Sequence, residues 1–416
     1  MALKKKPVNG MKDILPAEME IRDYVQGIIR ETYKSYGFTP IETPCMESIE
    51  NLSSKQGGEN EKLIFKILKR GEKLNLETAQ SESDVVDFGM RYDLTLPLAR
   101  FYANNANDLP QPFKALQMGP VWRADRPQRG RYRQFMQCDI DILGEPSNLA
   151  EIELILATTS TIGRIGFKGF EIHINDRRIL RAMADHAGFP EDAFDTVCII
   201  LDKMDKIGLE GVSAELREAG FDENAINTYT DMLEKTTRDM AGVETLAKAL
   251  GDDLSVDIKD NLTEIMTAVD GAKEADFRLV FDPTLVRGMG YYTGTIFEIV
   301  MPELGAACGG GGRYDKMIGR FTGQDTPACG FSIGFERIVL LLMESGFKVP
   351  GSSDKKAYLI EKGVDSSKLY EILKKAAAER GEGKTVLVSR MNKNKKFQKD
   401  KLSAEGYTDI EEFFKG

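Results

Sequence analysis

The sequence of 416 residues is poor in the residues that build zinc sites and nucleophilic triads. It holds two histidines, His173 and His186, and five scattered cysteines without a CxxC pair. A zinc site draws on several Cys or His ligands, and a Ser-His-Asp triad needs a histidine base. The sequence therefore indicates neither site. Dispersed cysteines in odd number are typical of reduced thiols, so we expect a cytoplasmic protein.

Long apolar runs and the common nucleotide-binding loops are also missing. No run of about 18 apolar residues occurs, so the sequence predicts no membrane-spanning helix. The basic start, MALKKKPVNG, has no apolar core behind it, so we expect no secretory signal. Neither a GxxxxGK[ST] loop nor a strand-GxGxxG-helix unit is present, which excludes the two best-known glycine-rich phosphate motifs.

The formal net charge is −10, and its distribution matters more than its sum. Phosphate-binding surfaces need Lys and Arg, so an evenly spread acidic surplus argues against a nucleic-acid partner. Here the surplus lies in residues 181–280, where acids clearly outnumber bases, whereas residues 355–416 carry 15 Lys or Arg against 10 Asp or Glu. The negative net charge therefore comes from residues 181–280. It does not exclude a nucleic-acid partner for the other segments.

Length and composition suit two or three globular domains, with hydrophobic residues at 42%. Apolar residues near helical spacing predict an amphipathic helix over 19–36. Two extended segments around a polar loop predict an antiparallel hairpin over 113–144. Residues 181–280 are typical of an inserted helical domain, and residues 355–416 alternate strand and helix.

The polar loop of that hairpin, VWRADRPQRGRYRQF, concentrates arginine around a single acid, Asp125. Arginine presents a planar fork that binds phosphate oxygens at two points. Because alternate residues of a strand share a face, we expect Arg129, Arg131 and Arg133 to point the same way. The alternative is a solvated charged loop, in which Asp125 is only a local ion-pair partner.

Two further segments combine glycine with polar side chains. In LVRGMGYYTGTIFEI, Arg287 precedes Tyr291 and Tyr292, which predicts either a polar ligand pocket or a bulged strand with core tyrosines. The run GAACGGGGRYD, residues 305–315, alone predicts a flexible hairpin, and its functional alternative is a backbone packed against a flat ligand.

Arg337 opens a helix after GFSIGFE, where it faces either a phosphate or solvent.

Taken in order, these segments resemble the histidyl-tRNA synthetase family over residues 7–345. PVNGMKDILPAEM is similar to the family's opening, and the helix followed by YGFTPIETP resembles class II motif 1. GPVWRADRPQRGRYRQFMQCDIDILG resembles motif 2, GFSIGFERI resembles motif 3, and LVRGMGYYTGTIFEI is similar to the family's histidine motif. The histidine motif together with GRYRQF is the specific part of this likeness.

The resemblance implies an α+β fold, in which the class II antiparallel sheet flanked by helices carries a helical insertion and a small C-terminal α/β domain. It assigns residues 1–176 and 279–350 to the catalytic core and residues 177–278 to the insertion. Residues 355–416 would form a shortened anticodon-binding-like domain. Because motif 1 builds the dimer interface in the family, the resemblance also implies a homodimer.

The implied activity is that of a histidine–tRNA ligase, which activates L-histidine with ATP and transfers it to the 3′ end of tRNA(His). Family precedent gives Arg123 and Arg287 to the α-phosphate, where charge builds during the reaction. Arg131 and Arg337 would hold the β- and γ-phosphates, and Asp125 would orient the adenine amino group. Mg²⁺ would bind mainly through the ATP phosphates, with no metal site made by the protein alone.

The same precedent supplies a histidine pocket. Asp93, Thr95 and Gln137 would take the α-ammonium, Asp141 and Tyr292 would take the imidazole, and Tyr291 and Arg287 would border the substrate. A pocket that pairs both imidazole nitrogens rejects apolar side chains of similar size.

The resemblance also leaves an alternative, a synthetase paralogue that does not charge tRNA, such as the histidine-sensing regulatory subunit of ATP phosphoribosyltransferase. Such proteins need no complete ATP clamp, whereas all four arginines assigned to phosphates occur here. The run KNKKFQKDK around Phe397 suits an RNA backbone and a stacked base, or else a solvated helix face.

Overall fold

The computed structural model describes residues 3–53, 62–286, 290–350 and 355–415. The chain divides into two compact units. Residues 1–13 and 25–342 belong to the first unit, and residues 14–24 and 343–416 belong to the second. None of the helices in the described ranges is long and apolar enough to cross a membrane.

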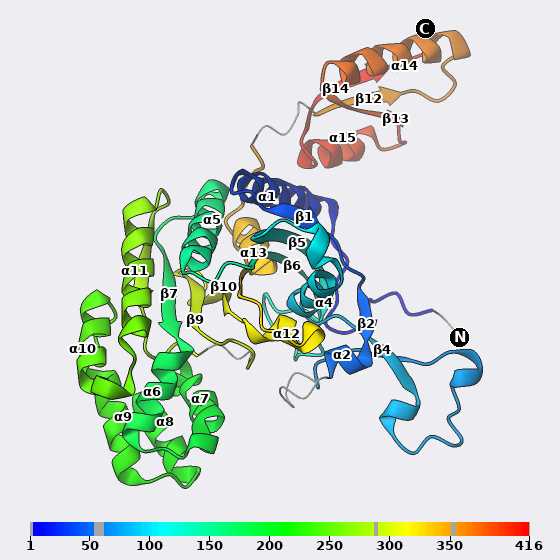
Figure 1. Ribbon diagram of the computed structural model, residues 1–416. Helices are drawn as coiled ribbons and strands as arrows, with labels where there is room; N and C mark the ends of the chain where they lie inside the picture. The colour runs from blue at the N-terminus through cyan, green and yellow to red at the C-terminus, as the bar shows by residue number, and fades with distance from the viewer. Residues whose placement is uncertain (1–2, 54–61, 287–289, 351–354, 416) are drawn as a thin grey trace. The chain divides into compact units, whose positions relative to one another are not determined.

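An eight-stranded sheet forms the centre of the first unit (Figure 1). Antiparallel pairs join its six inner strands, and a parallel pair closes each edge. In spatial order the strands are β1 (Thr39–Ile41), β5 (Phe113–Trp122), β6 (Gln134–Leu143), β11 (Ala328–Ile333), β10 (Ala306–Arg313), β9 (Thr295–Met301), β7 (Phe170–Asp176) and β8 (Phe277–Phe281). This mainly antiparallel sheet confirms the predicted fold class.

Helices cover the sheet through apolar faces. The predicted helix over 19–36 is α1 (Pro16–Ser35), and its second half buries Val25, Ile29 and Tyr33. Helix α5 (Leu149–Ile165) packs on β11 and β6 and ends at Gly166, whose φ of 115° is readily reached by glycine. Helix α13 (Phe335–Glu344) follows β11 directly, and α1, α5 and α13 lie near one another in Figure 1.

A smaller, three-stranded antiparallel sheet lies in the same unit. It has the order β2 (Met46–Ser48), β4 (Val86–Met90), β3 (Lys66–Leu68), and α2 (Ile49–Leu52) packs beside it. Helices α4 (Thr95–Asn105) and α12 (Lys316–Thr322) pack against each other. The segment RYDLTLPLARF follows β4 and enters α4 at Thr95, which places Asp93 two residues before the first turn of this helix.

The antiparallel hairpin predicted over 113–144 is confirmed, because β5 and β6 pair from Phe113↔Leu143 to Trp122↔Gln134. The strand on which the predicted common face of Arg129, Arg131 and Arg133 depends does not form. Residues 123–133 are not a strand, and the loop turns tightly between Gln128 and Arg131, where Gly130 has a φ of 70°. Without a strand, the alternation of side chains no longer applies.

The prediction that residues 305–315 form a flexible hairpin is also wrong. The glycine run lies in β10, which pairs with β9 on one side and β11 on the other. A Cβ on Gly311 would lie 1.9 Å from the carbonyl oxygen of Gly330, and one on Gly309 would lie 2.5 Å from the carbonyl oxygen of Ser332. Glycine is present here because the neighbouring backbone leaves no room for a side chain.

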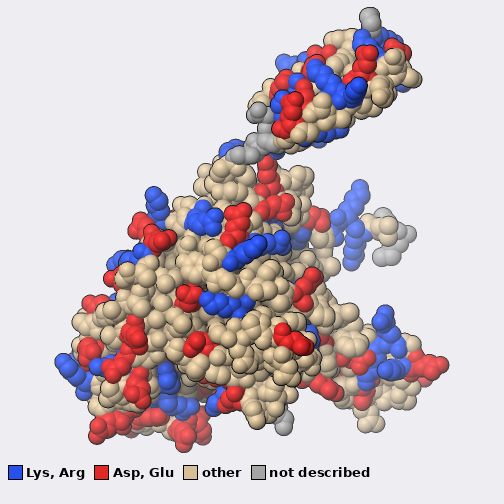
Figure 2. Space-filling model, turned by 45° about the horizontal axis from the view of Figure 1, so that its top comes forward, with Lys and Arg blue, Asp and Glu red and all other residues tan. Residues whose placement is uncertain are grey.

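Helices α6 to α11 make up the segment between β7 and β8. They are α6 (Arg177–Ala187), α7 (Phe194–Leu201), α8 (Met204–Glu218), α9 (Glu223–Lys235), α10 (Met240–Leu250) and α11 (Val256–Ala272). Phe189 anchors part of their core, with its ring edge-on to Phe221 and Tyr229. Acidic side chains gather over this segment along the lower left edge of Figure 2, as the sequence indicates.

The second unit contains a parallel sheet with the order β13-β12-β14. Its strands and helices alternate along the chain as predicted: β12 (Lys355–Ile360), α14 (Ser366–Gly381), β13 (Thr385–Arg390), α15 (Lys395–Ala404) and β14 (Tyr407–Phe413). Tyr358, Ile360, Ile372 and Ala376 form its core. Phe397 in α15 stays 65% exposed.

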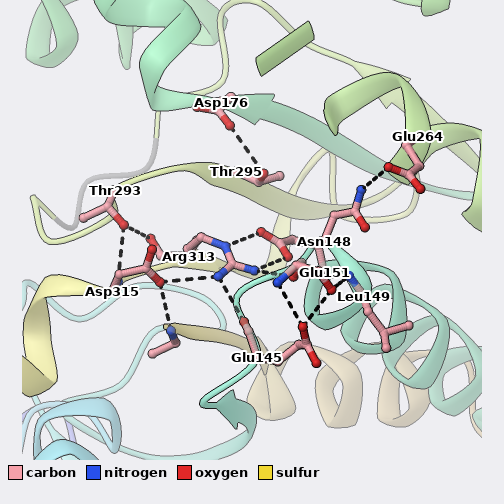
Figure 3. Close-up of polar contacts among 12 residues, drawn as sticks. Glu145, Asn148, Leu149, Glu151, Asp176, Glu264, Thr293, Thr295, Arg313 and Asp315 are labelled. Atoms are coloured by element: carbon pink, nitrogen blue, oxygen red, sulfur yellow. Dashed lines mark hydrogen bonds and ion pairs between the residues drawn. The ribbon is translucent and has the colours of Figure 1, made fainter. Parts of the chain in front are cut away.

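Arg313, at the end of β10, joins the sheet to α5 (Figure 3). Its Nε and Nη2 atoms donate to the Glu151 carboxylate at 2.7 and 2.6 Å, and further N–H groups reach the carbonyl oxygens of Glu145 and Ser147. Its own carbonyl oxygen accepts from the backbone N–H of Thr293 at 2.8 Å. The guanidinium of Arg313 thus ties β10 to the start of α5, and its backbone carbonyl ties β10 to the segment leading into β9.

We expect Glu151→Gln to destabilise the first unit by about 3 kcal/mol, because breaking a buried ion pair leaves one charge poorly paired. The exposed fractions of the two side chains are 1% for Glu151 and 11% for Arg313. The control is Asp231→Asn, which breaks an exposed pair with Lys235 and should cost less than about 0.5 kcal/mol. Urea unfolding followed by circular dichroism measures both, and equal costs would contradict the assigned role of Glu151.

Candidate active site

One cavity of about 390 Å³ lies in the first unit, over the middle of the large sheet. Strands β6, β10 and β11, the arginine-rich loop and the start of α13 provide its walls. Ten of the eleven predicted site residues line it, namely Asp93, Thr95, Arg123, Asp125, Arg131, Gln137, Asp141, Tyr291, Tyr292 and Arg337. The eleventh, Arg287, lies outside the described residues.

Strand β6 supplies one polar wall of the cavity. Gln137, Asp139 and Asp141 are two residues apart, so the alternation of a strand turns all three side chains to the same face. All three line the cavity and are at most 8% exposed. Asp139 was absent from the predicted site, although the alternation in QFMQCDIDIL was a signal that could have revealed it.

Several buried oxygens at this wall have no hydrogen-bond donor among the described residues. They are Oδ2 of Asp93, Oε1 of Gln137 and Oδ2 of Asp141. The other oxygen of Asp93 accepts from the Leu96 backbone N–H at 3.3 Å, which fixes the carboxylate at the start of α4. Buried acceptors without a donor are costly, so this wall is suited to a ligand that carries N–H groups.

Tyr314 belongs to the cavity and was missed by the sequence prediction. Its hydroxyl donates to Oδ1 of Asp141 at 2.6 Å, and its ring lies edge-on to Tyr291 with the centroids 6.1 Å apart. The rings of Tyr291 and Tyr292 are 4.8 Å apart. A Cβ on Gly330 would lie 2.0 Å from the Asp141 carboxylate, so this glycine makes room for the acid. The aromatic side chains and Asp141 form a polar pocket within the cavity.

Burial raises the pKa of all three carboxyl groups in this pocket. Desolvation is the largest cause for Asp139, whose pKa rises to about 7, and the charge of Asp93 raises it further. The pKa of Asp141 lies well above its ordinary value because of burial and the nearby Asp139 charge. The pKa of Asp93 is raised by burial, and Arg123 partly offsets this. The acids of this pocket therefore favour a cationic ligand.

Arginines line another part of the same cavity. Arg123 donates from Nε to the Tyr92 carbonyl oxygen at 2.8 Å, and its guanidinium lies 5.2 Å from the centroid of the Phe135 ring. Arg131 pairs with Asp125 at 3.0 Å. Arg337 stands on the first turn of α13. It lies beside Gly130 of the arginine-rich loop, since a Cβ added to Gly130 would be 3.5 Å from the Cγ atom of Arg337. The cavity thus combines buried acids with several cations.

Glu336, also missed from the sequence, connects the hairpin to α13. Its Oε1 accepts from the backbone N–H of Met136 at 3.0 Å. This contact holds β6 beside the helix that carries Arg337. In the described ranges no group of three Asp, Glu, His or Cys side chains is arranged to hold a metal ion.

Comparison with known proteins identifies the family. The chain matches the family described as "Histidyl-tRNA synthetase" over residues 10–338. It is 45% identical over 411 residues to a histidine–tRNA ligase of Leifsonia xyli, covering 96% of this chain and 93% of that protein. It is 38% identical to the histidine–tRNA ligase of Aeropyrum pernix, with 82% and 75% of the two chains covered.

The chain belongs to the histidyl-tRNA synthetase family. The crystal structure of histidyl-tRNA synthetase from Nostoc sp. PCC 7120 has a TM-score of 0.78 and 26% identity, covering 98% of this chain and 90% of that one. A second structure, named as an ATP phosphoribosyltransferase regulatory subunit/histidyl-tRNA synthetase from Bacillus halodurans, has a TM-score of 0.79 at 20% identity. At that identity the second likeness shows the fold alone.

Because burial raises the pKa of Asp139, we expect the protein to lose stability as this carboxyl group ionises. Its carboxyl pKa is about 7 in the folded state and about 3.9 in an unfolded chain. The folded state therefore binds the proton more tightly, and this contribution is lost as pH rises through about 7. Between pH 5 and 8 we expect the free energy of unfolding to fall by about 2 kcal/mol relative to Asp139→Asn.

Urea unfolding of the two proteins at several pH values measures this difference. Asp93 and Asp141 titrate in both proteins, and because the Asp139 charge raises the pKa of Asp141, the difference reports residue 139 together with its coupling to these neighbours. Parallel pH profiles would contradict the raised pKa of Asp139.

Proposed function

We propose that this protein is a histidine–tRNA ligase that activates L-histidine with ATP and passes it to the 3′ end of tRNA(His). The observation that carries the proposal is the set of buried oxygens on Asp93, Gln137 and Asp141 that have no donor among the described residues. An α-ammonium and an imidazole N–H supply the missing donors, and the arginines in the same cavity suit a triphosphate.

In the first step the histidine carboxylate attacks the α-phosphate of ATP. A bond forms between the carboxylate oxygen and the phosphorus, the bond to the bridging oxygen breaks, and pyrophosphate leaves. Negative charge grows on the phosphoryl oxygens, so cations already in position lower the barrier. We assign Arg123 and Arg287 to the α-phosphate and Arg131 and Arg337 to the β- and γ-phosphates.

Asp125 is assigned to the adenine amino group. Its ion pair with Arg131 supports a linked arrangement, because one carboxylate can orient the arginine while still accepting from the base. Mg²⁺ would be held mainly by the phosphates of ATP, since it prefers oxygen ligands and usually keeps several waters. Bound in that way, it would neutralise part of the phosphate charge.

The histidine pocket is assigned to the residues around Asp141. Asp93, Thr95 and Gln137 would hold the α-ammonium, while Asp141 and Tyr292 would hold the imidazole, with Tyr291 beside it. Asp141 is well suited to this task because Tyr314 occupies one of its oxygens and leaves the other free to accept. Substrates without an imidazole would leave this oxygen buried without a donor, which is the basis of discrimination.

In the second step the histidyl group moves from the adenylate to the terminal ribose of tRNA. The ribose hydroxyl attacks the acyl carbon, the bond to the phosphate oxygen breaks, and AMP leaves. We assign no protein side chain as general base. The adenylate phosphate itself takes the hydroxyl proton.

The domain division expected from the sequence belongs to the same proposal. Residues 1–176 and 279–350 would form the catalytic core, residues 177–278 the insertion and residues 355–416 a domain that contacts tRNA. The exposed Phe397, among the lysines of α15, supports contact between the last of these and RNA.

We also propose a cytoplasmic homodimer. The resemblance of α1 and the following YGFTPIETP to motif 1 supports the homodimer. The exposed apolar side chains Met46, Leu68 and Phe88 on the small sheet add apolar surface that such an interface can cover.

Histidine-dependent exchange of pyrophosphate into ATP, followed by charging of tRNA, tests the proposed function. We expect both activities, and Arg287→Ala should remove most exchange while histidine binding stays measurable. Exchange without charging would favour a paralogue that does not act on tRNA. Absence of exchange in the pure protein would overturn the enzymatic assignment.

Asp141→Ala tests the imidazole contact. Loss of a hydrogen bond to a charged group costs about 1.5–3 kcal/mol, so we expect histidine to bind about ten- to a hundredfold more weakly. ATP binding should change by less than about twofold, since Asp141 is assigned to the amino acid alone. Tyr314→Phe, which keeps the carboxylate and removes its partner, is the milder control. Equal losses for histidine and ATP would contradict the assignment.

A further inference from the structure

Asp139 is a buried carboxylate that the proposed chemistry leaves without a role. It stands between Gln137 and Asp141 on the cavity face of β6 and is 4% exposed. Across the sheet it pairs with Gln117 of β5 and Ser332 of β11. Burying an acid among other acids costs free energy. We therefore expect Asp139 to have a function that offsets this cost.

The contacts of Asp139 are directed at the protein. Ser332 Oγ donates to Oδ1 of Asp139 at 2.5 Å, and Gln137 Nε2 lies 3.1 Å from Oδ2 and 3.4 Å from Oδ1. Both of its oxygens therefore have donors, whereas Asp93 and Asp141 each keep a buried oxygen without one. Asp139 therefore holds the side chains of Ser332 and Gln137, while Asp93 and Asp141 each offer an open oxygen to a ligand.

The neighbour that Asp139 constrains is the Gln137 amide. An amide carries a donor end and an acceptor end of almost equal size, so its hydrogen-bond partners decide which way it faces. Above its pKa of about 7 the Asp139 carboxylate only accepts, so it attracts the NH₂ end. The Oε1 end of Gln137 then remains buried and without a donor at the wall of the cavity. The reverse orientation would bring oxygen against oxygen and turn the NH₂ group toward the ligand.

We propose that Asp139 is a positioning residue, which holds the Gln137 amide with its carbonyl oxygen toward the α-ammonium of the substrate. This inference rests on the proposed function, because it takes the substrate to be an amino acid. With the carbonyl oxygen in place, Gln137 and Asp93 offer two acceptors to one cation. With the amide reversed, Gln137 would present donors to a cation and exclude it.

The test is the substitution Asp139→Asn in the full chain. The introduced amide can donate to Gln137 Oε1, which frees the Gln137 side chain to reverse. In the exchange assay we expect the KM for histidine to rise about ten- to a hundredfold, the range for a lost hydrogen bond to a charged group. The KM for ATP should stay within about twofold. A KM for histidine that Asp139→Asn leaves unchanged would overturn the inference.

A ligand without the α-amino group separates positioning from damage to the pocket. 3-(Imidazol-4-yl)propionate keeps the imidazole and carboxylate of histidine but has no ammonium for Gln137 to accept from. Its inhibition constant against histidine should be the same within about twofold in the wild-type protein and in Asp139→Asn. A loss of affinity as large as that for histidine would show that Asp139 shapes the pocket in general and would contradict the proposed role.

The exchanged pair, Gln137→Glu with Asp139→Asn, supplies the rescue. The carboxylate placed at position 137 accepts at both oxygens, so its orientation no longer matters. The amide placed at position 139 donates to it, as Gln137 donates to Asp139 in the wild-type protein. We expect the double variant to recover most of the affinity for histidine lost in Asp139→Asn. Gln137→Glu alone should remain impaired, because two adjacent acids repel each other. No recovery in the double variant would contradict the positioning role.

Calorimetric binding of histidine distinguishes failure of this inference from failure of the proposed function. If the wild-type protein does not bind histidine, the proposed function is wrong and the positioning role is wrong with it. If the wild-type protein binds histidine and Asp139→Asn binds it equally well, only the positioning role is wrong.

Discussion

The close approach of β10 and β11 to the cavity is the constraint on which the site depends. Gly311 of β10 pairs with Phe331 and Gly330 of β11 pairs with Gly312. A Cβ on Gly311 would collide with the carbonyl oxygen of Gly330, and a Cβ on Gly330 would collide with the Asp141 carboxylate. The absence of side chains lets the sheet itself form the floor of the cavity and lets Asp141 lie against it. Tyr314, one residue beyond the end of β10, then reaches Asp141 with its hydroxyl.

The electrostatics of the cavity follow from this tight packing. Carboxyl groups that would ionise freely in water are held where burial raises their pKa, and two of their oxygens, one on Asp93 and one on Asp141, find no donor among the described residues. Such a pocket is unfavourable by itself and is stabilised when a cation with N–H donors enters. The same arrangement that costs stability in the protein alone therefore selects a ligand.

The Arg313–Glu151 pair, outside the pocket, ties β10 to α5.

Local sequence was a good guide wherever the structure is local. The β5–β6 hairpin, the helices between β7 and β8, and the alternating second unit all follow from apolar periodicity and turn residues. Two predictions failed where neighbours decided the outcome. The arginines of residues 123–133 leave the strand because the chain turns at Gly130, and the glycine run is a strand because β9 and β11 pair with it. Gly130 lies within the arginine-rich run, whereas the strands that pair with the glycine run lie outside it.

The sequence alone determined which chemical groups are available: several arginines for phosphate, acids and an amide for an ammonium, and tyrosines to enclose a polar ring. It also determined their order on β6, since the two-residue period of a strand places Gln137, Asp139 and Asp141 on one face. Only the tertiary structure decided which of them face a ligand. Ser332 and Gln137 donate to both oxygens of Asp139, whereas one oxygen of Asp141 remains open. Gln137 lies on the same strand as Asp139, but Ser332 and Tyr314 come from segments distant in the chain, and their hydroxyl groups decide which oxygens of Asp139 and Asp141 are already paired.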